Sequence, residues 1–141
     1  MSAPEVVVPA WPAPRGYANG RIGAGHALHV GGQIGWDTSR QFPEGGLVPQ
    51  FAQTLENILE IVQAAGGTAV DIATMTVFVT DIEAYRAAQR ELGAVWRERM
   101  GKHFPAMALI AVAALVEPAA VVEIQSVAYI GAGHGPAQEP G

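Results

Sequence analysis

A single glutamate inside an apolar stretch is the residue of this sequence best suited to do chemistry. Glu123 follows Val121 and Val122 and precedes Ile124, so a carboxylate interrupts a predicted strand of β-branched residues. Apolar surroundings disfavour the charged form of a carboxylate, which suits general acid–base work. The same spacing fits a structural glutamate that is satisfied by backbone groups or by a neighbouring subunit. The spacing alone favours the structural interpretation of Glu123 and leaves the catalytic one open.

A second group of candidates lies near the N-terminus. Tyr17 is either a ligand-contacting phenol or a packed aromatic residue, and the pattern does not separate the two. Arg15 and Arg21 flank it, and either guanidinium is able to pair with an anionic ligand, although a solvated surface arginine is the more common state of each. Trp36 is a candidate wall of an aromatic pocket or, alternatively, an interface residue.

Thiol, metal and phosphate-loop chemistry find no support in the residues. The chain has no cysteine, which excludes disulfides, thiol nucleophiles and thiolate ligands. His26 and His29 are three apart on a predicted strand and face opposite sides, while His103 and His134 lack partners at ligand spacing. The glycines of residues 23–32 lie between strands and not at a strand-to-helix turn. We therefore expect neither a metal nor a cofactor.

Composition limits the class of protein and its partners. The 141 residues suffice for one domain, and half of them are apolar while only 15% are charged, which leaves apolar area for a partner subunit. The net charge of -5 argues against nucleic acid as a partner. No apolar run approaches the roughly 18 residues of a membrane span, and no secretory leader is visible. We expect a cytoplasmic protein with no membrane partner.

The chain divides into three parts. Residues 1–14 contain four prolines and are predicted to form an extended N-terminal segment. Residues 15–130 carry regular periodicity and are predicted to form a single domain. Residues 131–141 are rich in glycine and proline, which favours a flexible C-terminal tail.

The periodicity within the domain predicts an α+β fold of order β-β-α-β-α-β-β. Strands are expected at residues 20–22, 26–34, 72–80, 106–114 and 121–130, and helices at residues 49–65 and 80–100. Gly66 and Gly67 supply the end of the first helix. Thr80 and Glu83 have the spacing of a capping box and would open the second.

Two helices can cover only one face of a mixed sheet, so the other face must meet water or another subunit. Glu123 and Gln125 share one side of the last predicted strand, and Met107 and Leu109 share one side of the strand before it. We expect these four residues on the helix-free face, buried against other copies of the chain.

Six short motifs, in order, resemble the RidA (YjgF) family of enamine/imine deaminases. They are GYANG at 16–20, GQI at 32–34, QTLENI at 53–58 with AAG at 64–66, TVFVTD at 76–81, FPA at 104–106 and VEI at 122–124. The likeness extends from about residue 15 to residue 130. It implies a sheet packed on two helices, assembled as a homotrimer that binds a small-molecule ligand in clefts between subunits. The free sheet face expected above agrees with that assembly.

The resemblance implies roles for particular residues. Tyr17 matches a tyrosine that closes the ligand cleft, and Gly32 matches a small residue beside the site. Glu123 matches the glutamate that positions or activates the hydrolytic water. Gln89 stands where an asparagine is usual, so an amide is retained with a longer reach.

Met107 is the main departure from the family pattern. The family's deaminases carry Pro-Ala-Arg here, and the arginine clamps the substrate carboxylate, whereas this chain has Pro105-Ala106-Met107. A bidentate arginine–carboxylate contact is worth roughly 1.5–3 kcal/mol, or on the order of 10- to 150-fold in binding. Leu109 also replaces a residue that is usually smaller, so the pocket is expected to be more apolar.

Two functions are compatible with this pattern. The first is a hydrolase or deaminase of a small enamine, imine or related conjugated metabolite, including aminomuconate-type molecules, whose specificity is altered by Met107. In that case Arg15 or Arg21 is a candidate to replace the missing guanidinium. The alternative is a non-catalytic trimer that binds a small molecule and keeps the cleft between subunits.

Overall fold

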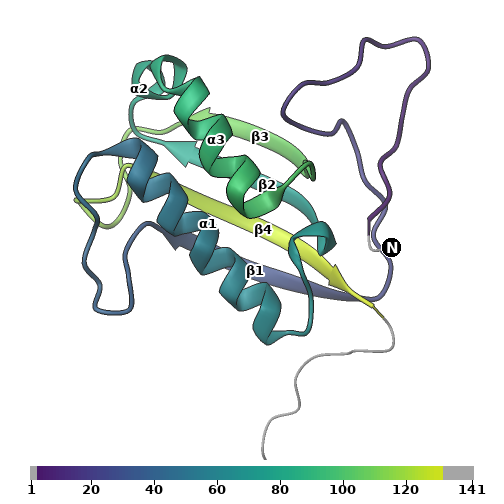
Figure 1. Ribbon diagram of the computed structural model, residues 1–141, viewed down its shortest axis with the longest axis horizontal. Helices are drawn as coiled ribbons and strands as arrows, with labels where there is room; N and C mark the ends of the chain where they lie inside the picture. Colours follow the sequence, from purple (N-terminus) through teal and green to yellow (C-terminus); the bar gives the residue numbers. More distant parts are fainter. Residues whose placement is uncertain (1–2, 132–141) are drawn as a thin grey trace, which may run out of the picture.

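The computed structural model describes residues 3–131, and its architecture is a four-stranded mixed sheet covered by helices (Figure 1). The strands are β1 (His26–Ile34), β2 (Ile72–Val79), β3 (Ala106–Ala111) and β4 (Val122–Ile130). The helices are α1 (Leu47–Ala64), a short 3-10 helix (Ala69–Asp71), α2 (Ile82–Ala87) and α3 (Gln89–Met100). The predicted α+β class is confirmed.

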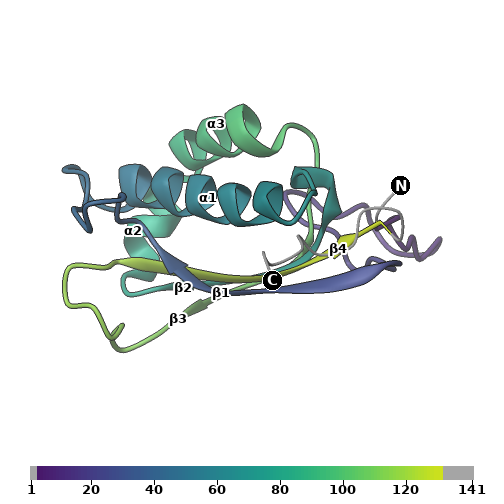
Figure 2. The ribbon, with the colours of Figure 1, turned by 90° about the horizontal axis from the view of Figure 1, so that it is seen from below.

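The sheet has the order β1-β4-β2-β3, so β1 and β3 are its edges. Strand β4 runs antiparallel to both β1 and β2, and β2 runs parallel to β3. Figure 2 shows α1 and α3 on one side of the sheet, and no described element lies beneath the other side. No helix in residues 3–131 is long and apolar enough to cross a membrane.

Helix α1 contributes an apolar face to the core. Its buried face carries Phe51, Leu55, Ile58 and Val62, at the spacing of an amphipathic helix. The helix ends in a Schellman motif, in which the N–H of Gly66 donates to the carbonyl of residue 63 and the N–H of residue 67 to that of residue 62, each at 2.9 Å. Gly66 has φ +90°, a conformation that favours glycine.

Two amides on α1 fix the strand ends that carry candidate site residues. The side chain of Gln50, which is 5% exposed, donates to the carbonyl of Ala119 and accepts from the N–H of Val121, both at 2.9 Å. It therefore holds the entry to β4. The Nδ2 of Asn57 donates to the carbonyls of Ile34 and Trp36, each at 2.9 Å, and holds the exit from β1.

Several predicted elements are corrected by the structure. Residues 20–22 form no strand; Arg21 makes only an isolated bridge with Glu5. The second predicted helix is two helices, broken at Ala88, and β3 ends three residues early. The cap of α2 is Asp81, not Thr80, because the Asp81 carboxylate accepts from the N–H of Glu83 at 3.0 Å and of residue 84 at 3.1 Å.

The shared face expected for Met107, Leu109, Glu123 and Gln125 is wrong. Met107 and Leu109 pair with Met75 and Val77 of β2, whose side chains are buried under the helices. Glu123 and Gln125 alternate with buried residues of β4 and point to the helix-free face. The error arises because β3 carries apolar side chains on both of its faces, so the alternation of its residues could not show which face is buried. Ile110, for example, is apolar but lies on the face away from Met107 and is 45% exposed.

A buried hydroxyl without a partner gives a stability prediction. The Oγ of Ser126 on β4 is buried and makes no hydrogen bond with any described residue, whereas the hydroxyl of Thr54 donates to the carbonyl of Gln50 at 2.7 Å. An unsatisfied buried hydroxyl costs on the order of 1 kcal/mol. We expect Ser126→Ala to leave unfolding free energy unchanged or raise it by up to about 1 kcal/mol in urea melts. Thr54→Val should lower it by about 1 kcal/mol; a larger loss from Ser126→Ala would contradict this reading.

The half-buried His103 gives a pH prediction. Burial lowers the pKa of its imidazole below the ordinary 6.5, and nearby Arg21 acts in the same direction, while a 2.7 Å hydrogen bond from Nε2–H to the carbonyl of Ile72 and the charge of Asp71 oppose this. The folded protein therefore binds this proton less well than the unfolded chain does. The contribution of His103 to stability is full above pH 6.5 and falls as pH drops through the depressed folded value.

The measurement is unfolding free energy from urea melts at about pH 7.5 and about pH 5.5. Wild type should lose more stability on acidification than His103→Gln, whose amide can still donate to the carbonyl of Ile72. Equal losses in the two proteins would show that His103 does not contribute to the pH dependence.

Candidate functional site

A cavity of about 510 Å³ opens on the helix side of the sheet, between α3, the edge strand β3 and the N-terminal segment. Most of its lining comes from residues 15–17, from residues 85–104 and from β3, and α1 and β2 add one residue each. The lining residues are Arg15, Gly16, Tyr17, Phe51, Val77, Tyr85, Gln89, Leu92, Gly93, Trp96, Arg97, Gly101, Lys102, Phe104, Met107 and Leu109.

The floor of this cavity is apolar. Met107 and Leu109 of β3 reach it from the sheet, and Leu92 and Trp96 reach it from α3. Trp96 is held in place by stacking on Phe104, with ring centroids 5.7 Å apart, and by a 3.0 Å hydrogen bond from its Nε1 to the carbonyl of residue 103. The floor is thus a rigid apolar surface that offers no charge to a ligand.

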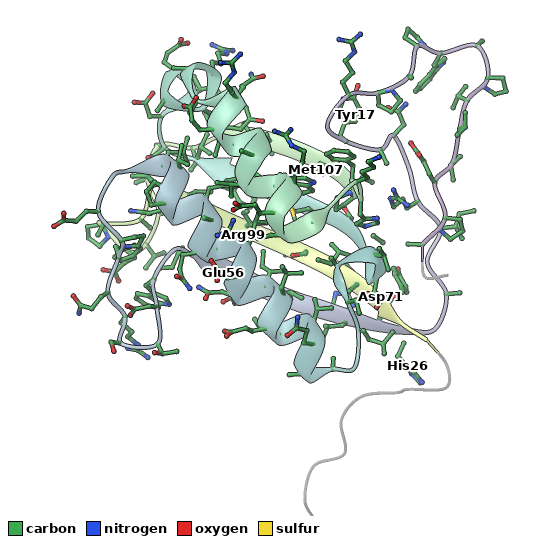
Figure 3. The ribbon with its side chains drawn as sticks, viewed as in Figure 1. Tyr17, His26, Glu56, Asp71, Arg99 and Met107 are labelled. Carbon is green, nitrogen blue, oxygen red and sulfur yellow. The ribbon has the colours of Figure 1, made fainter. Side chains whose placement is uncertain are left out.

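The outer wall of the cavity is formed by residues 15–17, which continue the N-terminal segment and are counted with it from here on. Figure 3 shows Tyr17 on this segment, outside the sheet edge that carries Met107, and both side chains line the cavity. Tyr17 is 43% exposed, so its phenol stands at the mouth. The neighbouring Ala18 ties the segment to β3, because its N–H donates to the carbonyl of Pro105 at 2.9 Å.

Arg21 lies outside the cavity and has a structural task. Its Nε donates to the carbonyl of Phe104 at 2.8 Å and its Nη1 to the carbonyl of Ala3 at 2.6 Å. The guanidinium therefore fastens the N-terminal segment to Phe104, two residues before the start of β3. Of the two arginines considered as replacements for the family arginine, only Arg15 lines the cavity.

The cavity also carries polar and charged side chains around its rim. Gln89, at the start of α3, adds an amide, and Arg97 and Lys102 join Arg15 as cations. Burial raises the pKa of the Tyr85 hydroxyl above its ordinary value, so this phenol stays protonated and able to donate. No aspartate or glutamate is found among the described residues that line the cavity.

Glu123 and Gly32 meet on the opposite, helix-free face. A Cβ built on Gly32 would overlap the carboxylate of Glu123, so the carboxylate is seated directly against the glycine. Glu123 is half-buried and makes no hydrogen bond or ion pair with another residue of the described chain. The acceptor sites of its carboxylate are therefore open to a ligand or a water.

Trp36 is part of neither group. It packs against Phe42, with ring centroids 5.9 Å apart, and the guanidinium of Arg40 lies 5.3 Å from its ring centroid. The loop after β1 accounts for all of these contacts. Trp36 is not a lining residue of the cavity.

The structure thus sorts the predicted residues into separate places. It brings together Arg15, Tyr17, Gln89, Met107 and Leu109 on the helix side. It places Glu123 with Gly32 on the other face, and it leaves Arg21 and Trp36 outside both. Among residues 3–131, no three His, Asp or Glu side chains are close enough together to hold a metal ion.

Sequence reasoning missed Arg97 and Lys102 as lining residues, because cations at a helix end are common. It also did not single out Trp96 as a lining residue. One available signal was Gly93, a glycine inside a helix that costs about 1 kcal/mol relative to alanine. Such a residue suggests that space beside the helix is needed, and Gly93 does line the cavity.

The sequence of this chain is similar to those of known proteins of one family. A family model described as Endoribonuclease L-PSP (Ribonuc_L-PSP) matches residues 10–130. The 2-iminobutanoate/2-iminopropanoate deaminase of Homo sapiens is 32% identical over 105 residues, which cover 74% of this chain and 73% of that protein.

Two solved structures share the fold. The YjgF gene product of E. coli has a TM-score of 0.65 at 29% identity, covering 89% of this chain and 98% of that one. The Rid family protein YyfB of Yersinia pestis has a TM-score of 0.81, covering 92% of this chain and 100% of that one; at 24% identity this likeness concerns the fold alone. By the extent of the family match and its deaminase relative, the chain belongs to the Ribonuc_L-PSP family, that of RidA and YjgF.

Proposed function

We propose that this protein hydrolyses a small enamine or imine, with a site completed by two copies of the chain in a homotrimer. The observation that carries the proposal is the carboxylate of Glu123 seated against Gly32, with no partner among the described residues, in a chain of this family. The human relative named as a 2-iminobutanoate/2-iminopropanoate deaminase supports the reaction class.

Two copies are needed because one copy separates the parts. The cavity lies on the helix side of β3, and Glu123 points from β4 to the other side of the same sheet. Moving the Glu123 side chain to the helix side would shift the register of β4 and expose the buried residues of that strand. The carboxylate and the cavity therefore cannot meet within one chain. The cavity opens at an edge strand, where the helix-free face of a second copy can approach it. This arrangement would place the partner's carboxylate at the cavity mouth.

The reaction requires a base, an acid and water. The carboxylate of Glu123 would accept a proton from water as its oxygen attacks the imine carbon. The same group, now protonated, would return the proton to the nitrogen of the carbinolamine. The carbon–nitrogen bond then breaks as the hydroxyl proton passes, by way of the Glu123 carboxylate, to the departing nitrogen, and the products are a carbonyl compound and ammonia. Tyr17 at the mouth and Gln89 at the rim would orient the substrate.

A second candidate function is a non-catalytic small-molecule binder. It is favoured by the cavity itself, whose described lining residues include no carboxylate and which has Met107 where the family's deaminases carry arginine. The family description names a ribonuclease, but a net charge of -5 gives nucleic-acid binding no electrostatic support.

Glu123→Gln separates the two candidates, because it keeps the shape and hydrogen bonding but removes the proton acceptor. For a hydrolase, turnover across a panel of imines should fall by about 10²–10⁴-fold. Gly32→Ala should also reduce it strongly, since the new Cβ would displace the carboxylate. Glu60→Gln, an exposed change on α1, is the matched control and should leave turnover unchanged.

Sedimentation of the same variants distinguishes the remaining outcomes. A monomeric wild type at micromolar concentration would contradict the shared site. Dissociation of a trimer on Glu123→Gln would identify this residue as a structural interface residue. An intact trimer with unchanged turnover would support the binder instead.

Met107→Arg tests the effect of the missing arginine. Wild type should hydrolyse 2-iminopropanoate poorly, because no cation lies on the cavity floor. The variant should gain on the order of tenfold or more in kcat/KM, if the charge-assisted contact with the carboxylate is recovered. Leu109→Ala in addition gives the guanidinium more room. Efficient turnover of 2-iminopropanoate by wild type would show that another cation already binds the carboxylate.

A further inference from the structure

We infer that the cavity binds an organic acid with an extended apolar body, such as an aryl or branched-chain carboxylate, and that it binds the acid group at the mouth. The inference deepens the proposed function and rests on it only for the identity of the site. The apolar part of the ligand would enter first and lie on the floor. The site would thus hold its ligand in the opposite sense to a site with an arginine at position 107.

The volume of the cavity and the apolar side chains of its floor favour a ligand with a sizeable apolar part. A volume of about 510 Å³ lies in the range of about 300–1,000 Å³ that is typical of sites for molecules much larger than a three-carbon acid. Met107 and Leu109 offer no hydrogen bond, and Trp96, which is 6% exposed, supports the floor from beneath and adds little accessible surface to it. A ring or a branched chain would replace water there at a gain proportional to the area it covers.

Three cations at the rim set the charge of the ligand. Arg15, Arg97 and Lys102 come from the N-terminal segment, from α3 and from the turn after α3, and all three are exposed lining residues. None makes an ion pair or a side-chain hydrogen bond with another described residue. By contrast, Arg99 on the same helix pairs with Glu56 of α1 at 3.1 Å (Figure 3).

The guanidinium of Arg97 lies beside Gly93 of the same helix. Its Nη1 lies 3.4 Å from a Cβ built on Gly93, so the guanidinium lies along the surface of α3 beside the cavity. The absence of a side chain at Gly93 therefore gives both the cavity and this guanidinium their space. An acid group at the mouth would be within the reach of this cation, and the phenols of Tyr17 and Tyr85 offer further donors.

The charge of the cavity opposes that of the chain. The protein carries a net charge of -5, yet its described cavity lining contains three cations and no carboxylate. Such a local concentration of one sign in a concave surface attracts ligands of the opposite sign. A helix end alone would account for Arg97 and Lys102, but it does not account for Arg15, which comes from a different part of the chain.

Calorimetric titration of the full-length protein with three matched probes tests this inference. The probes are 3-phenylpropionate, 3-phenylpropionamide and propionate, which remove the charge or the ring one at a time. We expect 3-phenylpropionate to bind about tenfold more tightly than the amide and at least about tenfold more tightly than propionate. Added salt should weaken the acid selectively. Equal affinity for the acid and the amide, or no binding of the acid, would overturn the inference.

Charge-removing variants locate the site. Arg15→Gln, Arg97→Gln and Lys102→Gln should each weaken 3-phenylpropionate binding by about two- to fivefold, as expected for exposed charges. Arg90→Gln is the matched control, because Arg90 is an exposed cation of α3 that does not line the cavity. An equal effect of Arg90→Gln would show a general charge effect and would contradict a built site.

Two further variants keep this inference separate from the proposed function. Glu123→Gln should not weaken the binding of the acid, whatever it does to turnover, since binding at the rim does not need a base. Met107→Arg should improve propionate binding and weaken 3-phenylpropionate, because it places a charge on the apolar floor. If 3-phenylpropionate binds as expected while no imine is hydrolysed, the ligand class stands and the hydrolase proposal fails. If imines are hydrolysed and the acid and amide bind equally, the reverse holds.

Discussion

The alternation of side chains along a strand is the constraint on which the rest of this structure depends. Because β2 pairs with β3 at Met75–Met107 and with β4 at Phe78–Glu123, the register places Met107 under the helices and Glu123 on the opposite face. No rotamer can bring the two side chains together through a packed sheet. In the function proposed above, the cavity and the carboxylate are two half-sites that oligomerisation would join.

The cavity and the surroundings of Glu123 each contain a glycine beside the candidate residues and a side-chain hydrogen bond that joins distant parts of the chain. Gly32 lets the Glu123 carboxylate lie against the backbone of β1, and Gly93 opens the surface of α3 at the cost of helix stability. Arg21 fastens the N-terminal wall to Phe104, two residues before β3, and Gln50 fastens the entry to β4. The scaffold thus gives up some local stability where a ligand is to be admitted and restores rigidity directly beside it.

Periodicity predicted the fold class, the bounds of α1 within two residues and the free sheet face, because amphipathic patterns are local, but it did not reveal the break at Ala88 in the second predicted helix. It could not assign a face to Met107, since β3 is apolar on both sides. Motif resemblance placed Tyr17 and Gln89 at the cavity but could not reveal that Arg21 is committed to two backbone carbonyls. Lys102 was missed as a lining residue because it faces a cavity whose other wall is formed by residues 15–17, some 85 residues earlier in the chain.

Cross-linking of introduced cysteines tests the shared site most directly, because the natural chain contains none. Tyr17→Cys at the cavity mouth and Glu123→Cys on the free face lie on opposite sides of one chain, so a short bismaleimide could join them only between copies. The account predicts covalent trimers of this double variant on a denaturing gel, and far fewer when Arg90→Cys replaces Tyr17→Cys. Monomers only, or equal cross-linking of both pairs, would contradict a site built from two copies.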